Sequence, residues 1–323
     1  MSKLRLSLTA LSVVALLSGC SSASNPNMAA FEGVKQTCTN FVGGEEIDKV
    51  QFNTPENKVP TAEFVTTDSK AGVESSLAKI TKTQTKIVKM GNGPKFTGDQ
   101  LTILEYAVYS STTGKLLGAS NFDGSNPASQ VFDSKSSKLY CDAITGVPEG
   151  SIVAFATPSN EEDPEGSLFI FELKRVYLPR ANGAEGSPAS GLPQVVRDPA
   201  TGRPGLIDPA FAKPNVFRSH VLVEGKGEVV KEGDTIVAHY TLWQWSDSIG
   251  GALESSWDSA PATLQIANGQ VISAWVKGLT GVKVGSQVEI FATPKEAYGP
   301  SGNSSIGPNA YLLFVVDVLG INK

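Results

Sequence analysis

The amino-acid sequence predicts an α+β protein made of two copies of one domain, each an antiparallel β-sheet wrapped around one short α-helix. The chain has 323 residues, which is too many for one ordinary core of about 100–150 residues. Its 32 glycines and 19 prolines are typical of a turn-rich, mostly β protein. Apolar and polar residues alternate between turn signals over 45–178 and again over 215–323. The net charge of −5 argues against nucleic-acid binding, for which basic surfaces are usual.

The start of the chain predicts an export signal followed by a tether. Two basic residues precede an apolar run over 6–17, which is too short to span a bilayer and is typical of a signal peptide. The run ends in Leu-Ser-Gly-Cys at Cys20. This ending resembles a bacterial lipobox, in which the peptide is removed before the cysteine and the thiol carries a diacylglyceryl group. We expect a signal peptide over 1–19, a lipid on Cys20 and a polar tether over 20–44, on the outer side of the cytoplasmic membrane. The alternative is an ordinary secretory signal with a chance cysteine.

Two further cysteines, Cys38 and Cys141, are candidates for a disulfide. In an exported protein two thiols are more often paired than free, so we expect a bond that ties the tether to the first copy. The alternative is two unrelated buried thiols. With two histidines and no Cys-x-x-Cys pattern, the sequence predicts neither a metal site nor a cofactor.

The two alternating regions are copies of one another, and we call them the first repeat (45–178) and the second repeat (215–323). Five matches occur in the same order at similar spacing, including Thr145-Gly146-Val147 with Thr280-Gly281-Val282 and Phe155-Ala156-Thr157-Pro158 with Phe291-Ala292-Thr293-Pro294. The residues between the repeats, 179–214, are rich in Pro and Gly and predict a linker with one strand at most.

The second repeat contains the parts of an apolar pocket. Ile236, Ala238 and Tyr240 share one face of a predicted strand, because strand side chains alternate between faces. The one convincing helix, over 273–279, carries Trp275. These residues supply apolar walls with a few hydroxyl and amide donors, and no nucleophile.

The second repeat resembles the FK506-binding-protein (FKBP) family of peptidyl-prolyl cis-trans isomerases over about 219–321. The motifs follow the family's order and nearly its spacing: Gly233-Asp234 with Tyr240-Thr241, Leu253-Glu254-Ser255-Ser256, Gly269-Gln270-Val271-Ile272 with Trp275, Gly281 with Gly285, Ala297-Tyr298-Gly299, and Ile306-Gly307-Pro308-Asn309-Ala310. The whole chain is similar to exported tandem members of the family found as bacterial lipoproteins. The resemblance implies two FKBP-like domains, each with a half-wrapped sheet around a helix, and a cleft that takes a proline ring.

The resemblance also implies roles for single residues. Trp275 is expected to form the floor of the pocket and Tyr298 to donate its hydroxyl to a substrate carbonyl, with the backbone N–H of Ile272 as a second donor. The remaining site residues are expected in the walls and rim, with Ile306 on a flap over the site: Tyr240, Leu253, Glu254, Val271, Ile272 and Phe314.

Such a site suits the rotation of an X–Pro bond, which has a barrier of about 18–20 kcal/mol. No bond in the chain is made or broken, so a catalyst need only bind the twisted amide more tightly than the planar forms. An apolar, water-poor cleft favours the less dipolar twisted carbonyl, and aligned hydrogen bonds hold the ends of the peptide. No general base is required.

Three departures from the family pattern predict lower activity or an altered preference for the residue before proline. Leu253 and Glu254 stand where the family most often has Phe and Asp, and Ala262 stands roughly where many members have an aromatic residue.

The first repeat departs further. Without a gap Glu105 falls opposite Tyr240, and an insertion is needed to bring Tyr106 there. Other pocket positions also differ: Gly118 falls opposite Glu254, Ser136-Ser137 opposite Val271-Ile272, Tyr140 opposite Trp275, and an acidic stretch over 160–166 replaces Ala-Tyr-Gly. We expect this repeat to be an inactive spacer or a peptide-binding domain.

The predicted function is that of a membrane-anchored, monomeric prolyl isomerase acting on proline-containing exported polypeptides and able to bind FK506- or rapamycin-like ligands. The alternative is a proline-peptide-binding or chaperone module with little or no isomerase activity. A third hypothesis is that the protein is a structural spacer in the cell envelope.

Overall fold

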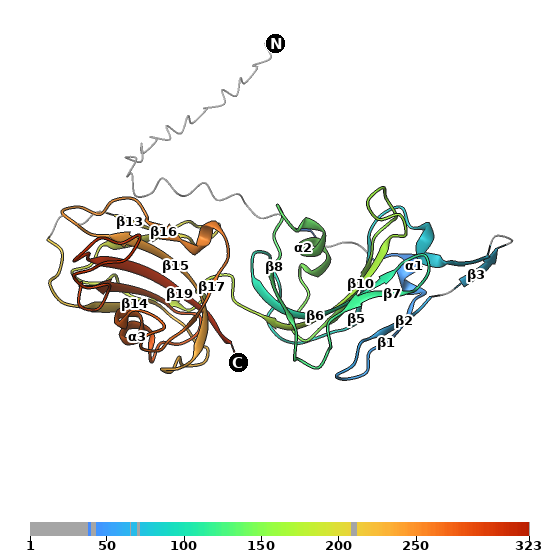
Figure 1. Ribbon diagram of the computed structural model, residues 1–323, viewed down its shortest axis with the longest axis horizontal. Helices are drawn as coiled ribbons and strands as arrows, with labels where there is room; N and C mark the ends of the chain where they lie inside the picture. Colours follow the sequence, from blue (N-terminus) through green and yellow to red (C-terminus); the bar gives the residue numbers. More distant parts are fainter. Residues whose placement is uncertain (1–37, 40–42, 65, 70–71, 208–211, 323) are drawn as a thin grey trace, which may run out of the picture.

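The computed structural model describes residues 38–39, 43–64, 66–69, 72–207 and 212–322. The expected signal peptide, the expected lipidation site Cys20 and most of the expected tether lie outside these residues. No helix in this part of the chain is long and apolar enough to cross a membrane. The described residues form antiparallel sheets with few helices, in agreement with the α+β prediction, and the two large sheets follow one another along the long axis of the molecule (Figure 1).

The first repeat is built on a six-stranded sheet in the order β5-β9-β10-β6-β7, with β8 also paired to β6. Its strands are β5 (Gln84–Lys89), β6 (Leu101–Ser110), β7 (Leu116–Ala119), β8 (Ala128–Val131), β9 (Ile152–Ala156) and β10 (Ser167–Val176). Helix α2 (Lys138–Ile144) packs on one face of this sheet.

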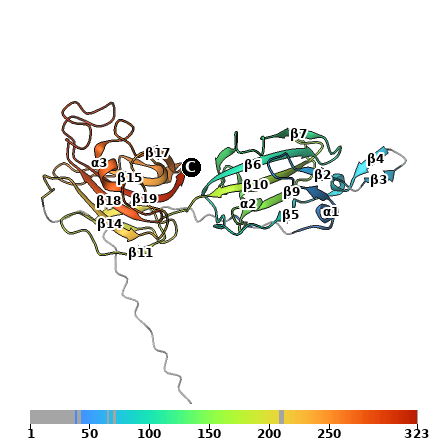
Figure 2. The same ribbon diagram turned by 90° about the horizontal axis from the view of Figure 1, so that it is seen from below.

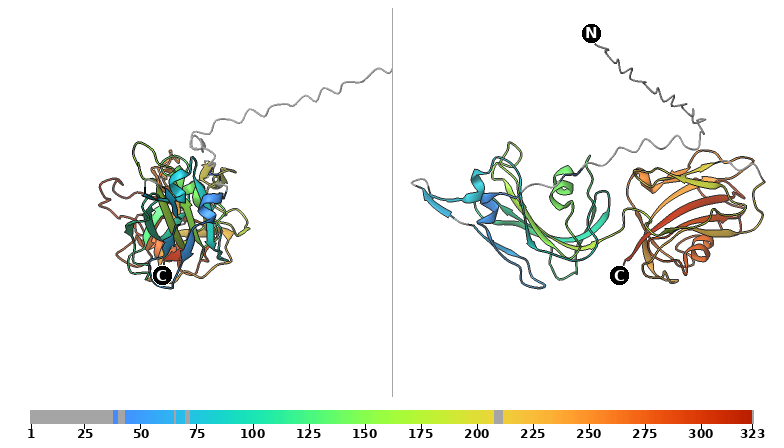
Figure 3. Two further views of the ribbon diagram at one scale, coloured as in Figure 1. Left: turned by 90° about the vertical axis from the view of Figure 1, so that its right-hand side faces the viewer. Right: turned by 180° about the vertical axis from the view of Figure 1, so that it is seen from behind.

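An additional N-terminal layer covers the other face of the first sheet. It contains α1 (Glu45–Asp48), β1 (Gln51–Asn53), β2 (Thr61–Glu63) and a 3-10 helix (Ser76–Lys79). The hairpin of β3 (Thr66–Ser69) and β4 (Gly72–Ser75) projects from the end of the molecule that is farthest from the second repeat (Figures 1 and 3).

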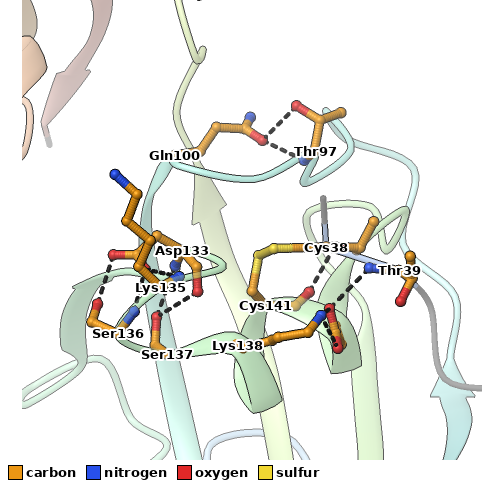
Figure 4. The surroundings of a disulfide bond; sticks show 12 residues. Cys38, Thr39, Thr97, Gln100, Asp133, Lys135, Ser136, Ser137, Lys138 and Cys141 are labelled. Atoms are coloured by element: carbon orange, nitrogen blue, oxygen red, sulfur yellow. Dashed lines mark hydrogen bonds and ion pairs between the residues drawn. A yellow bond between two sulfur atoms is a disulfide. The ribbon is translucent and has the colours of Figure 1, made fainter. Parts of the chain in front are cut away.

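Cys38 and Cys141 form a disulfide, with their Cα atoms 5.7 Å apart. Beside it, the Thr39 N–H donates to the Asp142 carboxylate at 2.9 Å, and the Lys138 ammonium pairs with the same carboxylate at 2.8 Å (Figure 4). The end of the tether is therefore fixed to α2.

The second repeat is built on a seven-stranded sheet in the order β11-β14-β18-β19-β15-β16, with β17 also paired to β15 (Figure 2). Its own strands are β14 (Arg218–Glu224), β15 (Thr235–Gln244), β16 (Glu254–Ser255), β17 (Ala262–Gln265), β18 (Gln287–Ala292) and β19 (Leu312–Asn322), with a 3-10 helix over Ser256–Asp258. Helix α3 (Ser273–Leu279) has the bounds expected from the sequence and packs on one face of the sheet.

Hydrogen bonds identify corresponding residues in the two repeats. The N–H of Tyr106 donates to the Ser120 hydroxyl at 2.9 Å, and the N–H of Tyr240 donates to the Ser256 hydroxyl at 2.9 Å. Tyr106, and not Glu105, therefore corresponds to Tyr240. The ungapped comparison was wrong by one residue on this strand.

A similar device aligns the next strand. In each repeat a glycine N–H donates to a serine hydroxyl, that of Ser151 at 2.9 Å and that of Ser286 at 2.8 Å. Counting four residues on from each serine, Phe155 corresponds to Ile290 and not to Phe291. The shared Phe-Ala-Thr-Pro is therefore out of register by one residue, and the two phenylalanines lie on opposite faces of their sheets.

The segment 179–214 was expected to form a linker with one strand at most, but its described residues contain three strands. They are β11 (Ala184–Glu185), which joins the edge of the second sheet, and the hairpin of β12 (Gln194–Arg197) and β13 (Pro204–Ile207). Figure 1 shows β13 on the side of the second sheet away from α3. We call residues 184–207 the strap, because its apolar residues pack with the outer face of the sheet in one core: Ala189, Leu192, Val195 and Leu206 with Trp243, Trp245, Ile249, Phe291, Tyr311, Leu313 and Val315.

The first repeat joins the second through a packed contact. Tyr177, which follows β10, lies against β19 so closely that a Cβ on Gly320 would be 2.4 Å from its ring. The Tyr177 hydroxyl contacts the Asn322 side chain at 3.1 Å, and the Leu178 N–H donates to the Leu319 carbonyl at 3.2 Å. A glycine is therefore required at position 320 for this approach.

Glu289, on the outer face of β18, predicts a pH dependence of stability. It is 0% exposed, and neither carboxylate oxygen has a hydrogen-bond partner among the described residues. Burial raises its pKa to about 8. In the unfolded chain the carboxyl loses its proton near pH 4.3, so its burial costs stability increasingly as the pH rises from about 4 to about 8.

We therefore expect Glu289→Gln to raise the free energy of unfolding relative to the parent by an amount that grows with pH and reaches a few kcal/mol near pH 8. Urea unfolding of both proteins between pH 4 and pH 9 measures this difference. A difference that stays constant with pH would contradict the assignment to Glu289.

Candidate functional site

A cavity of about 390 Å³ lies between α3 and the inner face of the second sheet. It is open to solvent and mainly apolar, with a tyrosine hydroxyl and a carboxylate at its edge. Its lining residues are Tyr240, Leu242, Glu254, Leu264, Gly269, Gln270, Val271, Ile272, Trp275, Tyr298 and Phe314.

Trp275 forms the aromatic centre of this cavity. Its ring meets those of Tyr240 and Phe314 edge to face, with centroids 5.4 Å and 5.6 Å away. Helix α3 comes this close to the sheet because Gly278 has no side chain, since a Cβ there would lie 2.7 Å from the Ile290 side chain. The three rings therefore form a fixed apolar corner that can receive a small ring.

The start of α3 provides a wall and a donor. Val271 and Ile272 are half-buried and pack against the same core. Ile272 is the N-cap of α3, and the first backbone N–H groups of a helix have no intrahelical acceptor. The N–H of Ile272 can therefore donate to a bound peptide.

Tyr240 and Tyr298 bring two hydroxyls to the opening. The Tyr240 hydroxyl donates to the Glu254 carboxylate. Burial and this hydrogen bond raise the pKa of Tyr240, and burial and the Glu254 charge raise that of Tyr298. Both hydroxyls are therefore neutral donors at physiological pH, and Tyr298, which is 40% exposed, faces the opening.

Two of the expected site residues do not line the cavity. Leu253 is 52% exposed beside it. Ile306, expected on a flap over the site, is 5% exposed and buried in the core that also holds Trp275. Ala262 is likewise outside the lining, and its strand contributes Leu264 instead.

Four lining residues were not predicted as site residues, although two of them belong to a family motif: Leu242, Leu264, Gly269 and Gln270. Leu242 follows Tyr240 by two residues, and the two-residue period of a strand would have placed it on the same face.

His239, on the opposite face, stacks on Trp257 with ring centroids 4.1 Å apart, and burial lowers its pKa to about 3. It is a neutral core residue.

The first repeat keeps more aromatic residues at the corresponding place than the sequence predicted. Strand pairing and the helices place Tyr106 at the position of Tyr240, Tyr140 at that of Trp275 and Phe169 at that of Phe314. The Tyr140 and Phe169 rings meet edge to face at 5.5 Å. Phe155 and Phe171, however, stand at the positions of Ile290 and Val316. Aromatic rings therefore fill the space that smaller aliphatic side chains occupy in the second repeat.

A second, polar cavity of about 300 Å³ lies where the chain enters the strap. Arg197 bonds to Gln287 at 2.7 Å and to Glu185 at 2.9 Å. The Asp317 carboxylate accepts hydrogen bonds from Gln287 at 2.6 Å and from the Ala181 N–H at 2.8 Å. These side chains satisfy one another, so the cavity is part of the strap's attachment.

Comparisons with known proteins identify what the chain is similar to. Residues 226–319 match the family described as FKBP-type peptidyl-prolyl cis-trans isomerase. An FK506-binding protein of Streptomyces anulatus is 36% identical over 101 residues, which are 30% of this chain and 80% of that protein. Outer membrane protein MIP of Legionella longbeachae is 31% identical over 124 residues, 38% of this chain and 49% of that protein. The crystal structure of FkpA from Escherichia coli is 32% identical, with a TM-score of 0.30, over 33% of this chain and 48% of that one.

Proposed function

The chain belongs to the FKBP-type peptidyl-prolyl cis-trans isomerases, and from that premise we propose that the cavity of its second repeat rotates X–Pro bonds in exported polypeptides. The observation that carries the proposal is the corner formed by Trp275, Tyr240 and Phe314, with the Tyr298 hydroxyl at its opening. The proline ring enters the corner. The carbonyl before it turns out of conjugation within reach of Tyr298.

The chemistry follows from the kind of groups present. A twisted amide has lost its resonance, so its carbonyl is less dipolar than in either planar form and is favoured by an apolar wall. The N–H of Ile272 holds the peptide on one side and the Tyr298 hydroxyl on the other. Glu254 fixes the Tyr240 ring through its hydroxyl, which keeps the aromatic corner open for the substrate.

Tyr298→Phe tests the role of the hydroxyl. We expect kcat/KM to fall by about threefold to tenfold, since a hydrogen bond made in the transition state contributes about 0.5–1.5 kcal/mol. The measurement is a protease-coupled assay of the full chain on an Ala-x-Pro-Phe peptide series. A wild-type chain that gives only the uncatalysed rate would refute the isomerase, and a normal rate in the variant would refute the role of Tyr298.

A second candidate function concerns the first repeat. Its half-buried rings Tyr106, Tyr140 and Phe169 provide aromatic surface, whereas Gly118 and the 160–166 loop supply neither the carboxylate nor the tyrosine of the second repeat. We propose that this repeat does not isomerise proline bonds. It serves as a spacer, or holds proline-containing segments on its aromatic rings.

We also propose that the protein is exported and anchored by a lipid on Cys20, facing outward from the cytoplasmic membrane as a monomer. The signal-like residues 1–19 support this, and the disulfide supports an oxidising compartment. The relative named outer membrane protein MIP is consistent with a cell-envelope location.

Cys20→Ser is expected to move the protein from the membrane fraction to the soluble fraction of cells. Retention in the membrane fraction would contradict the lipid anchor.

A further inference from the structure

We infer that Glu296 is a positioning residue, a buried carboxylate that latches the loop carrying Tyr298 to the helix carrying Trp275. The inference rests on the proposed function. Tyr298 reaches the cavity from the turn after β18, while Trp275 reaches it from α3. The distance between the Trp275 ring and the Tyr298 hydroxyl therefore depends on how firmly this loop is held against α3.

Glu296 joins the two elements through both its backbone and its side chain. Its carbonyl accepts hydrogen bonds from the Ala274 N–H at 3.1 Å and the Ser273 hydroxyl at 3.4 Å, both in the first turn of α3. Its carboxylate accepts from the Thr293 hydroxyl at 2.5 Å and pairs with the Lys277 ammonium at 3.3 Å. The loop is thus tied to two successive turns of the helix.

The carboxylate is buried and charged. Glu296 is 7% exposed, and a buried charge is costly unless it is paired. The Thr293 hydrogen bond, followed by Lys277, holds the pKa of Glu296 below its usual value despite burial, so it is anionic at neutral pH. The Lys277 ammonium is itself placed by the Phe217 ring, 5.6 Å away. The Lys277 side chain is 51% exposed, so the ion pair alone contributes little, and the hydrogen bond from Thr293 is the stronger tie to the carboxylate.

The first repeat shows that the fold does not need such a latch. Its corresponding loop, 158–166, lacks the tyrosine and bonds to the end of β6 instead. The Ser111 N–H donates to the Gly166 carbonyl at 3.0 Å, and the Thr112 and Ser110 hydroxyls donate to Glu165. The tie between loop and helix is present in the repeat that carries Tyr298, which is why we assign it to positioning.

Glu296→Ala in the full chain is expected to lower kcat/KM by about threefold to tenfold, mainly through kcat, because misplaced groups cost transition-state binding. The loss should not exceed that of Tyr298→Phe. If Glu296 acts through Tyr298, adding Glu296→Ala to Tyr298→Phe should cost less than about twofold more. Full and independent losses in the double variant would overturn the inference.

Two matched variants separate positioning from loss of fold. Glu296→Gln keeps an acceptor for Thr293 and should recover part of the rate. Lys295→Ala removes a charge from an exposed neighbour in the same loop and should leave the rate unchanged. An equal loss in Lys295→Ala would show a general electrostatic effect and overturn the inference.

Hydrogen exchange, measured without substrate, tests the tie between the loop and α3 independently of isomerase activity. The Gly299 N–H donates to the Pro294 carbonyl at 2.8 Å within the loop. Hydrogen exchange at this amide should speed up at least about fivefold in Glu296→Ala and stay unchanged in Lys295→Ala. A wild-type chain without activity would refute the proposed function alone, whereas unchanged exchange in Glu296→Ala would refute the latch alone.

Discussion

Trp275→Ala is expected to reduce kcat/KM by more than about tenfold, because it removes the floor of the cavity and the edge-to-face contacts of two wall rings. The indole is 4% exposed and lies in the core of the second repeat, so the free energy of unfolding should also fall, by about 3–5 kcal/mol. The rate should be measured by exchange NMR without a coupling protease, since a protease would digest a destabilised variant.

A matched variant is needed to separate the two effects. Trp243 is 1% exposed on the outer face of the same sheet, so Trp243→Ala should lose a similar amount of stability. It should keep the activity of each folded molecule, since the cavity is on the other face. Equal losses of activity in the two variants would show that Trp275 acts only through folding. Trp275→Phe, which retains a ring, should lie between wild type and Trp275→Ala.

The parts of the site that could be predicted are those fixed by short-range spacing. The bounds of α3 and the place of Trp275 on it follow from a local apolar pattern and family motifs. Val271 and Ile272 are adjacent to that helix. Leu253 and Ile306 were predicted less well, because whether a loop residue faces a cavity or a core depends on packing that local sequence does not determine.

Identical residues in the two repeats did not predict how their strands correspond in the structure. Identical Phe-Ala-Thr-Pro runs suggested one alignment, whereas the serine hydrogen bonds place Phe155 opposite Ile290. A shift of one residue on a strand moves each side chain to the other face. Phe155 packs with α2, and Phe291 packs under the strap. The same residue type therefore serves two different cores.

The strap was not predicted because its Pro- and Gly-rich composition is typical of a linker. The sequence of the second sheet nevertheless indicated that a further layer must cover it. Residues 312–321 of β19 are apolar at nearly every position, Asp317 apart, and all of them are buried. An antiparallel strand with one face in water alternates in polarity, whereas a strand that is apolar on both faces must be covered on both. Helix α3 covers one face. The second layer had to come from another part of the chain.

A fragment that begins at residue 215 is therefore expected to be severely destabilised. Without the strap, Trp243, Phe291 and Leu313 would lose their cover. Burial of one large apolar side chain contributes about 1.5–3 kcal/mol, so the total loss is comparable to the stability of a typical domain. Asp317, whose pKa burial raises to about 6, would also lose its bond from Ala181. A fragment that begins at residue 179 keeps the strap and should unfold cooperatively.

Urea unfolding followed by tryptophan fluorescence, with binding of a hydrophobic dye to detect exposed apolar surface, compares the two fragments. A point substitution provides the control for chain length. Leu206 is 0% exposed in the core between strap and sheet, so Leu206→Ala in the fragment starting at 179 should cost about 2–5 kcal/mol. Lys226→Ala, at an exposed position of the second repeat, should cost less than about 1 kcal/mol. If the fragment starting at 215 were as stable as the longer one, the strap would be a linker after all, and the outer face of the second sheet would be stable in water.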